Sequence, residues 1–152
     1  MLIKLYLLER ITLKIKVNVP EKIGKGYKTF WNFKGRYRVV KGGRASKKST
    51  TNAQWIIYKM MQYPLANTLV IRRVFNTHKD STWTQLKWAT NNLGVSHLWK
   101  FSKSPLEATY LPTGQKILFR GLDDPMSITS ITVEIGYLCW CWFEEAFQIM
   151  DE

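Results

Sequence analysis

The eight residues from Gly42 to Ser49, GGRASKKS, have the types and spacing best suited to chemistry. They resemble the phosphate-binding P-loop G-x-x-x-x-G-K-[ST], in which main-chain N–H groups surround the phosphates of a nucleotide. In that chemistry Lys48 reaches the outer phosphates and the hydroxyl of Ser49 holds Mg²⁺. A helix starting here would add the partial positive charge of its N-terminus. The spacing favours a nucleotide-binding loop, and a basic turn that binds no nucleotide is the alternative.

One position departs from this motif, because Lys47 stands where glycine is expected. A side chain there would strain the loop by roughly 1 kcal/mol if its φ must be positive. The surrounding sequence still favours the motif. A β-prone run, Tyr37–Val40, precedes it, and apolar residues recur at helical spacing from Thr50 to Tyr63, where Pro64 ends the pattern.

A second candidate lies near the other end of the chain, where Glu144 and Glu145 follow the apolar run Leu138–Phe143. An apolar strand ending in two acids resembles the Walker B element. There the first carboxylate holds the Mg²⁺ shell and the second orients the attacking water. The alternative is an acidic helix N-terminus favoured by the helix dipole. The P-loop pattern some 95 residues upstream makes the Walker B interpretation the better one.

Alternating strands and helices are needed to position these two motifs. We expect a strand over Thr68–Phe75 and then a helix that Asp80 or Ser81 caps and Gly94 closes. One face of this helix carries four residues at helical spacing: Trp83, Leu86, Thr90 and Leu93.

Two further β segments, Glu107–Leu111 and Lys116–Leu122, flank the turn residues 112–114 and are expected to pair. Leu138–Phe143 is apolar on both faces, which is typical of a central strand covered by helices on each side. The predicted fold class is therefore α/β, a P-loop NTPase-type, mainly parallel sheet flanked by helices.

The charge of the chain is unevenly distributed. Of the formal net charge of +12, residues 1–60 carry +13, from 15 Lys and Arg against two acids. Residues 61–152 carry −1, from eight Lys and Arg against nine acids. A segment this basic would attract phosphate groups, and a solvated basic surface is the alternative. With 45% hydrophobic and 14% aromatic residues, the chain is not of the intrinsically disordered class.

Other residues of chemical interest have weaker patterns. Cys139 and Cys141 are expected to be buried, reduced thiols, since a zinc site would need about four ligands. Arg72 and Arg73 either approach phosphate or form surface ion pairs. The aromatic residues around Trp31 either stack on bases or cover the sheet edge, and Asp123–Pro125 is expected to form a turn.

Taken together, these motifs resemble one family, the tailed-phage terminase large subunits, which package DNA into proheads. The sequence GGRASKKS after R-Y-R-V-V is similar to the family's G-G-R-G-S-G-K-S. The similarity runs from about Val19 to the C-terminus, and three further stretches carry it: Val70–Arg73 leading to Lys79–Ser81, Ile117–Asp124, and Trp142–Ala146.

This resemblance implies a role for each matching residue. Lys48 would be the P-loop lysine, and Ser49 and Glu144 would hold Mg²⁺. Glu145 would be the catalytic carboxylate, and Arg44 would stabilise the γ-phosphate as arginine fingers do. ATP would be bound by the whole loop: Gly42, Gly43, Arg44, Ala45, Ser46, Lys47, Lys48, Ser49 and Thr50. Ala45 and Lys47 replace glycines of the family pattern.

The resemblance further implies a DNA-packaging ATPase acting in the bacterial host cytoplasm, without a membrane. Its partners would be double-stranded DNA, the terminase small subunit, the portal protein and further copies of itself on the portal. Residues 1–35 are expected to be a basic lead-in, and residues 36–152 an ATPase domain truncated after Walker B, without the nuclease domain. A non-hydrolysing basic DNA-binding or assembly module left by truncation is the alternative.

Overall fold

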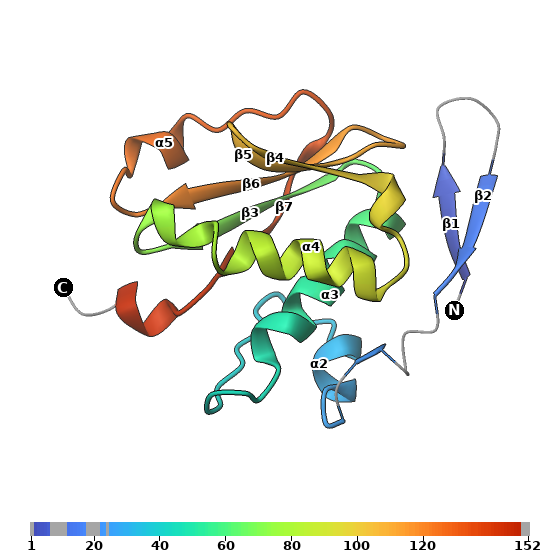
Figure 1. The fold of residues 1–152 in the computed structure, drawn as a ribbon, viewed down its shortest axis with the longest axis horizontal. Coiled ribbons are helices and arrows are strands. Elements are labelled where there is room, and N and C mark those ends of the chain that lie inside the picture. Colours follow the sequence, from blue (N-terminus) through green and yellow to red (C-terminus); the bar gives the residue numbers. More distant parts are fainter. Residues whose placement is uncertain (1, 7–11, 18–21, 24, 150–152) are drawn as a thin grey trace.

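A five-stranded sheet with helices on its two faces forms the body of the molecule in this computed structural model, which describes residues 2–6, 12–17, 22, 23 and 25–149 (Figure 1). The strand order is β4-β5-β6-β3-β7, and β1 and β2 pair separately as an antiparallel hairpin. The elements are β1 Leu2–Tyr6, β2 Thr12–Lys16, α2 Lys28–Asn32, α3 Lys48–Gln62, β3 Ala66–Arg72, η1 Phe75–His78, α4 Thr82–Asn92, η2 Ser96–Leu98, β4 Trp99–Lys103, β5 Leu106–Tyr110, β6 Gln115–Gly121, α5 Met126–Thr129, β7 Tyr137–Phe143 and η3 Ala146–Ile149.

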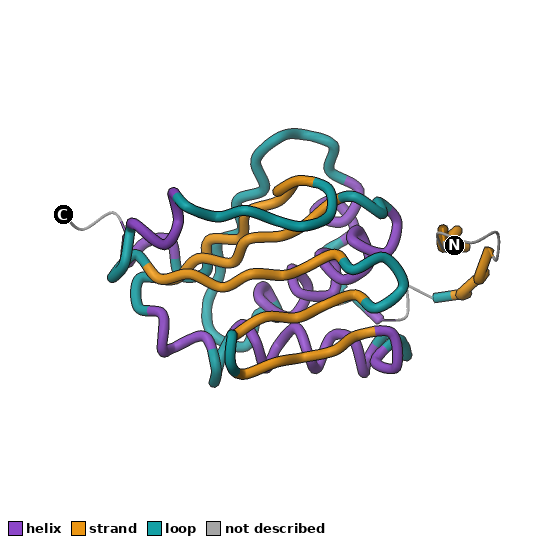
Figure 2. Tube along the Cα trace, turned by 90° about the horizontal axis from the view of Figure 1, so that it is seen from above, coloured by secondary structure: helices purple, strands orange, loops and turns teal. Residues whose placement is uncertain are grey.

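The α/β class is confirmed, but the sheet is mixed rather than mainly parallel. β3 runs parallel to β6 on one side and to β7 on the other. β5 runs antiparallel to both of its neighbours, β4 and β6. The reason is local: short turns join these three strands, and a short turn can connect only antiparallel neighbours. Figure 2 shows the strands of the sheet side by side, seen from above.

The helices expected from apolar periodicity are present. α3 begins at Lys48, two residues before the predicted start, and buries Ile56, Ile57 and Met60 completely or almost so. α4 follows Ser81 as its N-cap residue and buries Trp83 and Leu86. Gly94 has a φ of +73°, the left-handed conformation predicted for a helix-closing glycine.

The apolar interior divides into two layers, one on each face of the sheet. The larger layer lies between the sheet and α3 and α4, and includes Val70, Ile117 and Phe119 from the strands. The smaller layer centres on Leu69, Ile71 and Leu118, with partly buried apolar residues from the α5 region packed against it. The alternation of side chains along β3 and β6 therefore serves both layers.

Two buried amides fix how α3 connects to the sheet. The side-chain nitrogen of Gln115 donates to the carbonyls of Met60, Tyr63 and Ala66, at 3.2, 2.7 and 2.6 Å. The side-chain oxygen of Asn67 accepts from the main-chain N–H of Lys116 at 2.6 Å. Because the last carbonyls of a helix have no partner within it, Gln115 satisfies groups that would otherwise be buried without one.

β7 differs from its prediction, because it is an edge strand in the part of the chain that the structure describes. Its pattern of apolar residues on both faces indicated a central strand. Tyr137 is instead 59% exposed and Phe143 50% exposed. Cys139 and Cys141 are exposed and form no disulfide, so the expectation of buried thiols is wrong, although partial burial raises the pKa of the Cys141 thiol to about 11.

Tyr37–Val40 is not a strand, contrary to the prediction. These residues belong to no helix or strand, and Val39 is 92% exposed. A β-prone sequence needs a hydrogen-bonding neighbour to form a strand, and none lies beside it among the described residues. The guanidinium of Arg38 instead lies over the ring of Trp55, 4.0 Å from its centre.

The segment 1–35, expected to be a basic lead-in, has secondary structure in its described part. It contains the β1–β2 hairpin and α2, and Trp31 on α2 is buried against Tyr58 of α3, with ring centres 5.4 Å apart. Trp31 is therefore part of the core rather than a base-stacking residue. No helix in the described ranges is both long and apolar enough to cross a membrane.

Candidate nucleotide site

The loop before α3 adopts the backbone conformation that the glycine pattern requires. Ala45 and Lys47, the two residues that replace glycines of the family pattern, have φ values of +61° and +62°. This is the left-handed region, which costs a residue with a side chain roughly 1 kcal/mol or more. The strain expected at Lys47 is therefore present, and Ala45 shares it.

The side chain of Lys48 lies across this loop. Its ammonium donates to the carbonyls of Gly42 and Gly43, at 2.6 and 2.9 Å, and to the hydroxyl of Ser46 at 3.1 Å. A Cβ on Gly42 would approach the Ser46 hydroxyl to 3.2 Å, so glycine is favoured by close packing there. The loop thus curls around a fixed positive charge at the start of α3.

The two sequence motifs meet at Ser49. Its hydroxyl donates a hydrogen bond to one carboxylate oxygen of Glu144, across a separation of 95 residues. The other oxygen of Glu144 accepts from the indole N–H of Trp142 at 2.9 Å. The main-chain N–H of Glu144 bonds to the carbonyl of Ile71 at 3.0 Å, which continues the pairing of β7 with β3 beyond Phe143. Glu144 is therefore held by its backbone and by both carboxylate oxygens.

Glu145 is held by Arg72, which the sequence analysis expected either to approach phosphate or to form an ion pair. The guanidinium of Arg72, at the end of β3, lies 2.5 Å from a carboxylate oxygen of Glu145. Arg72 also donates to the carbonyl of Thr77, at 3.2 Å, and to the hydroxyl of Ser81. Glu145 itself has a φ of +57°, so the chain turns sharply after Glu144 and separates the two acids. Of the two interpretations of Arg72, ion pairing is the one observed.

The remaining predicted residues surround this centre to different degrees. Thr50 donates from its hydroxyl to the carbonyl of Lys47 at 2.9 Å, within the first turn of α3. Arg44 is exposed. Tyr27, which the motifs did not indicate, donates from its hydroxyl to the carbonyl of Ser46 at 2.5 Å. Tyr27 is thus a contributor that no short motif marks, and Trp142 is one to which the sequence assigned no role.

The oxygen atoms of Ser49 and Glu144 are of the kind that Mg²⁺ prefers. The described residues contain no group of three or more His, Cys, Asp or Glu side chains able to hold a metal alone. This donor set fits an ion that takes one carboxylate and one hydroxyl from the protein and further oxygens from phosphates and water. It does not fit a metal held entirely by protein side chains.

His78, to which the sequence assigned no role, is buried outside this centre. Its ring nitrogens lie 2.7 Å from the hydroxyl of Thr82 and 2.8 Å from the carbonyl of Arg120. Burial lowers the pKa of its imidazole, so the neutral form is favoured. His78 therefore serves as a hydrogen-bonding part of the core.

Comparison with known proteins connects this geometry to one family. A family model described as phage terminase large subunit matches residues 34–152. The terminase large subunit of Bacillus phage SPP1 is 50% identical over 114 residues, which are 75% of this chain and 27% of that protein. The PBSX phage terminase large subunit of Bacillus subtilis (strain 168) is 30% identical over 122 residues, 80% of this chain and 27% of that protein. The chain thus matches about a quarter of the length of each relative.

Proposed function

The chain belongs to the phage terminase large subunit family, and from that premise we propose that residues 36–152 bind and hydrolyse Mg-ATP to drive viral DNA into proheads. The observation that carries this proposal is the hydrogen bond between Ser49 and Glu144. It joins the start of α3 to the end of β7, so a phosphate-binding loop and two carboxylates lie together. Two unrelated surface features would have no reason to converge in this way.

The loop residues Gly42–Thr50 cradle the phosphates in this proposal. Lys48 holds the outer phosphates with its ammonium, and the exposed Arg44 adds a second positive charge for the γ-phosphate. Ser49 and Glu144 would hold Mg²⁺, which would offset the negative charge of the phosphates when bound. The left-handed conformation at Ala45 and Lys47 turns main-chain N–H groups toward the same space.

Glu145 is the proposed catalytic carboxylate. It orients a water molecule and accepts its proton as the water oxygen bonds to the γ-phosphorus. The bond from that phosphorus to the bridging oxygen breaks, and its electron pair leaves with ADP. Arg72 acts through Glu145 as a positioning residue, because its guanidinium fixes where the carboxylate lies. Carboxylate geometry matters here because small misplacements of a reacting group reduce rates strongly.

The partners follow from the family rather than from contacts of this chain. We propose double-stranded DNA as the translocated substrate, and the terminase small subunit, the portal protein and further copies of this chain as assembly partners. The proposed place of action is the cytoplasm of the bacterial host. The basic segment within residues 1–60 provides charge that would favour a DNA partner.

Two substitutions test the proposal directly. Lys48→Ala is expected to weaken Mg-ATP binding at least tenfold, and Glu145→Gln to retain binding but lose hydrolysis. Lys41→Ala and Glu134→Gln are matched controls, since each changes the same residue type at an exposed position outside the site. Binding is measured with a fluorescent ATP analogue and hydrolysis by phosphate release. If the site variants behave like their controls, the assignment is wrong.

A further inference from the structure

Two lysines from different elements meet at one tryptophan ring between α4 and β4. Trp83, in the first turn of α4, is buried, and its indole N–H donates to the carbonyl of Ser102 on β4 at 3.2 Å. The ammonium of Lys87, one helical turn later, lies 5.5 Å from the centre of this ring, and that of Lys103, at the end of β4, lies 5.8 Å from it. The two ammonium groups therefore lie no farther apart than these two distances added together.

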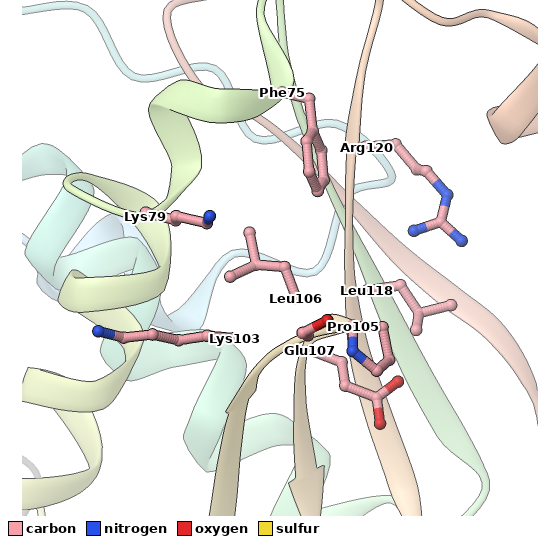
Figure 3. A pocket seen from close by; sticks show the side chains of 9 residues that line it. Phe75, Lys79, Lys103, Pro105, Leu106, Glu107, Leu118 and Arg120 are labelled. Carbon is pink, nitrogen blue, oxygen red and sulfur yellow. The ribbon is translucent and has the colours of Figure 1, made fainter.

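Lys79 adds a third positive charge on the same side of the sheet. It lines, with Lys103, a pocket of about 280 Å³ between η1, the β4–β5 turn and β6. Figure 3 shows both lysines on one side of β6, whereas the side chain of Arg120 lies on the other side. The hydroxyl of Thr84 on α4 donates to the main-chain carbonyl of Lys79 at 2.7 Å, which ties this residue to the first turn of the helix. The exposed residues Lys79, Lys87 and Lys103 are called the lysine cluster below.

The lysine cluster is not neutralised by acids of the described residues. Residues 81–106 include three lysines and no Asp or Glu, and Asp80 and Glu107 flank this stretch. Glu107 pairs with Lys116 at 3.3 Å, and no described acid forms an ion pair with the lysine cluster. Asp80 directly follows Lys79, so any screening by its carboxylate falls at that end of the cluster. The two lysines beside the tryptophan ring therefore keep their full charge.

The exposed face of α4 adds uncharged polar groups beside the lysine cluster. Thr84, Lys87 and Asn91 are exposed and follow one another at intervals of three and four residues, so they lie along one face of the helix. Hydroxyl and amide side chains, like ammonium groups, are common donors to phosphate and sugar oxygens in protein–DNA interfaces. This face therefore presents donors to an anionic partner and no acid to repel it.

We propose that this face of α4 and the end of β4 bind the sugar–phosphate backbone of double-stranded DNA, with Lys87 and Lys103 as the phosphate contacts. The proposal rests on the packaging function proposed above and names the surface that touches the DNA. A duplex carries one negative charge per roughly 1.7 Å of its axis, so two ammonium groups this close reach phosphates of the same short segment. Contacts to phosphate position a protein on a duplex without reading its bases, which suits a motor that moves DNA of any sequence.

The test measures binding of a fluorescein-labelled 30-base-pair duplex by anisotropy, without nucleotide, at several salt concentrations. Lys87→Ala and Lys103→Ala are each expected to weaken binding several-fold. Each should also reduce the slope of log K against log salt by about 1, and the double variant by about 2, as for lost phosphate contacts. A thermal melt of each variant confirms that it is folded.

Lys100→Ala is the matched control. Lys100 is an exposed lysine of the same strand as Lys103, so its replacement removes the same charge. Side chains alternate along a strand, and Lys100 therefore points to the face opposite that of Lys103. Its replacement should change duplex binding less than twofold.

Three results would overturn the proposal. The first is a wild-type protein that does not bind the duplex. The second is an equal loss of binding in Lys87→Ala, Lys103→Ala and Lys100→Ala, which indicates a diffuse basic surface. The third is Lys87-dependent binding of phosphatidylglycerol vesicles without binding of the duplex, which indicates a membrane surface instead.

The assays of Lys48→Ala and Glu145→Gln with ATP test the proposed function separately, because duplex binding is measured without nucleotide. If those two variants behave like their controls while duplex binding depends on Lys87 and Lys103, the proposed ATPase site fails and the DNA surface stands. The reverse pair of results removes the DNA surface and leaves the ATPase site.

Discussion

Replacing Ala45 and Lys47 with glycine should stabilise the protein, which is the reverse of the usual effect of glycine. Both residues occupy the left-handed backbone region, with φ values of +61° and +62°. Neither side chain is needed for the hydrogen bonds of the turn. Lys47 contributes its main-chain carbonyl, which accepts from the N–H of Thr51 and the hydroxyl of Thr50, both at 2.9 Å.

The magnitude follows from two opposing contributions. A left-handed residue with a side chain costs roughly 1–2 kcal/mol. Glycine removes that cost but adds about 0.5–1 kcal/mol of freedom to the unfolded chain. The net gain is therefore about 0.5–1 kcal/mol for each replacement. For a chain of this size, 1 kcal/mol raises Tm by roughly 2–4 °C.

Thermal and urea denaturation of Ala45→Gly, Lys47→Gly and the double variant measure this gain. Arg44→Gly is the internal control, because Arg44 directly precedes Ala45 in the same loop and is not among the residues with positive φ. It should lower stability by about 0.5–1 kcal/mol. If all three single glycine variants change Tm in the same direction, left-handed strain is not what distinguishes these positions and the reasoning is refuted.

Three further predictions concern residues away from the loop. Arg72→Ala should lower kcat for ATP hydrolysis by roughly tenfold or more and leave KM nearly unchanged, because only the position of the Glu145 carboxylate is lost. Arg72→Lys should restore part of kcat. Equal losses of kcat in both variants would contradict a positioning role. Gln115→Leu should destabilise the fold by roughly 2–4 kcal/mol in urea denaturation, since three carbonyls lose their donor; a loss below 0.5 kcal/mol, on the order of a surface change, would argue against this. In a Cys139→Ser variant, the rate of alkylation of Cys141 should rise about tenfold per pH unit from pH 8 to 10. The reason is that partial burial raises the pKa of this thiol to about 11, and the thiolate is the reactive form. A plateau near pH 9, as for a free thiol, would show an unshifted pKa.

Local sequence patterns were sufficient where one element determines its own form. The period of apolar residues in α3, the turn residues between β5 and β6 and the closing glycine of α4 all correspond to observed features. These signals work because helix periodicity and turn geometry depend on residues a few positions apart. The predicted meeting of Ser49 and Glu144 relied on two motifs and their order, and the structure brings these residues into contact.

Features that depend on a neighbouring strand were not predictable from local patterns. β7 has apolar residues on both faces, yet within the described part of the chain it pairs with a strand, β3, along only one of its edges. Tyr37–Val40 has β-prone residues but no partner to pair with. The ion pair of Arg72 and Glu145 joins residues 73 positions apart, and nothing in the sequence around either one specifies the other. In each case the deciding interaction lies outside the local window.

The position of β7 in the sheet also bears on the order in which the molecule folds. β4, β5 and β6 follow one another through short turns, so their pairing closes small loops and carries little entropic cost. β7 must instead find β3 across about 70 residues, as in the pairing of Thr68 with Trp140. Long-range parallel pairing of this kind forms slowly. Because Glu144 and Glu145 directly follow β7, the two carboxylates reach Ser49 and Arg72 only when the last strand docks. A chain still on its way to the native state therefore contains the loop Gly42–Thr50 without Glu144 and Glu145 beside it, and the ATP turnover proposed above would be restricted to molecules that have completed the sheet.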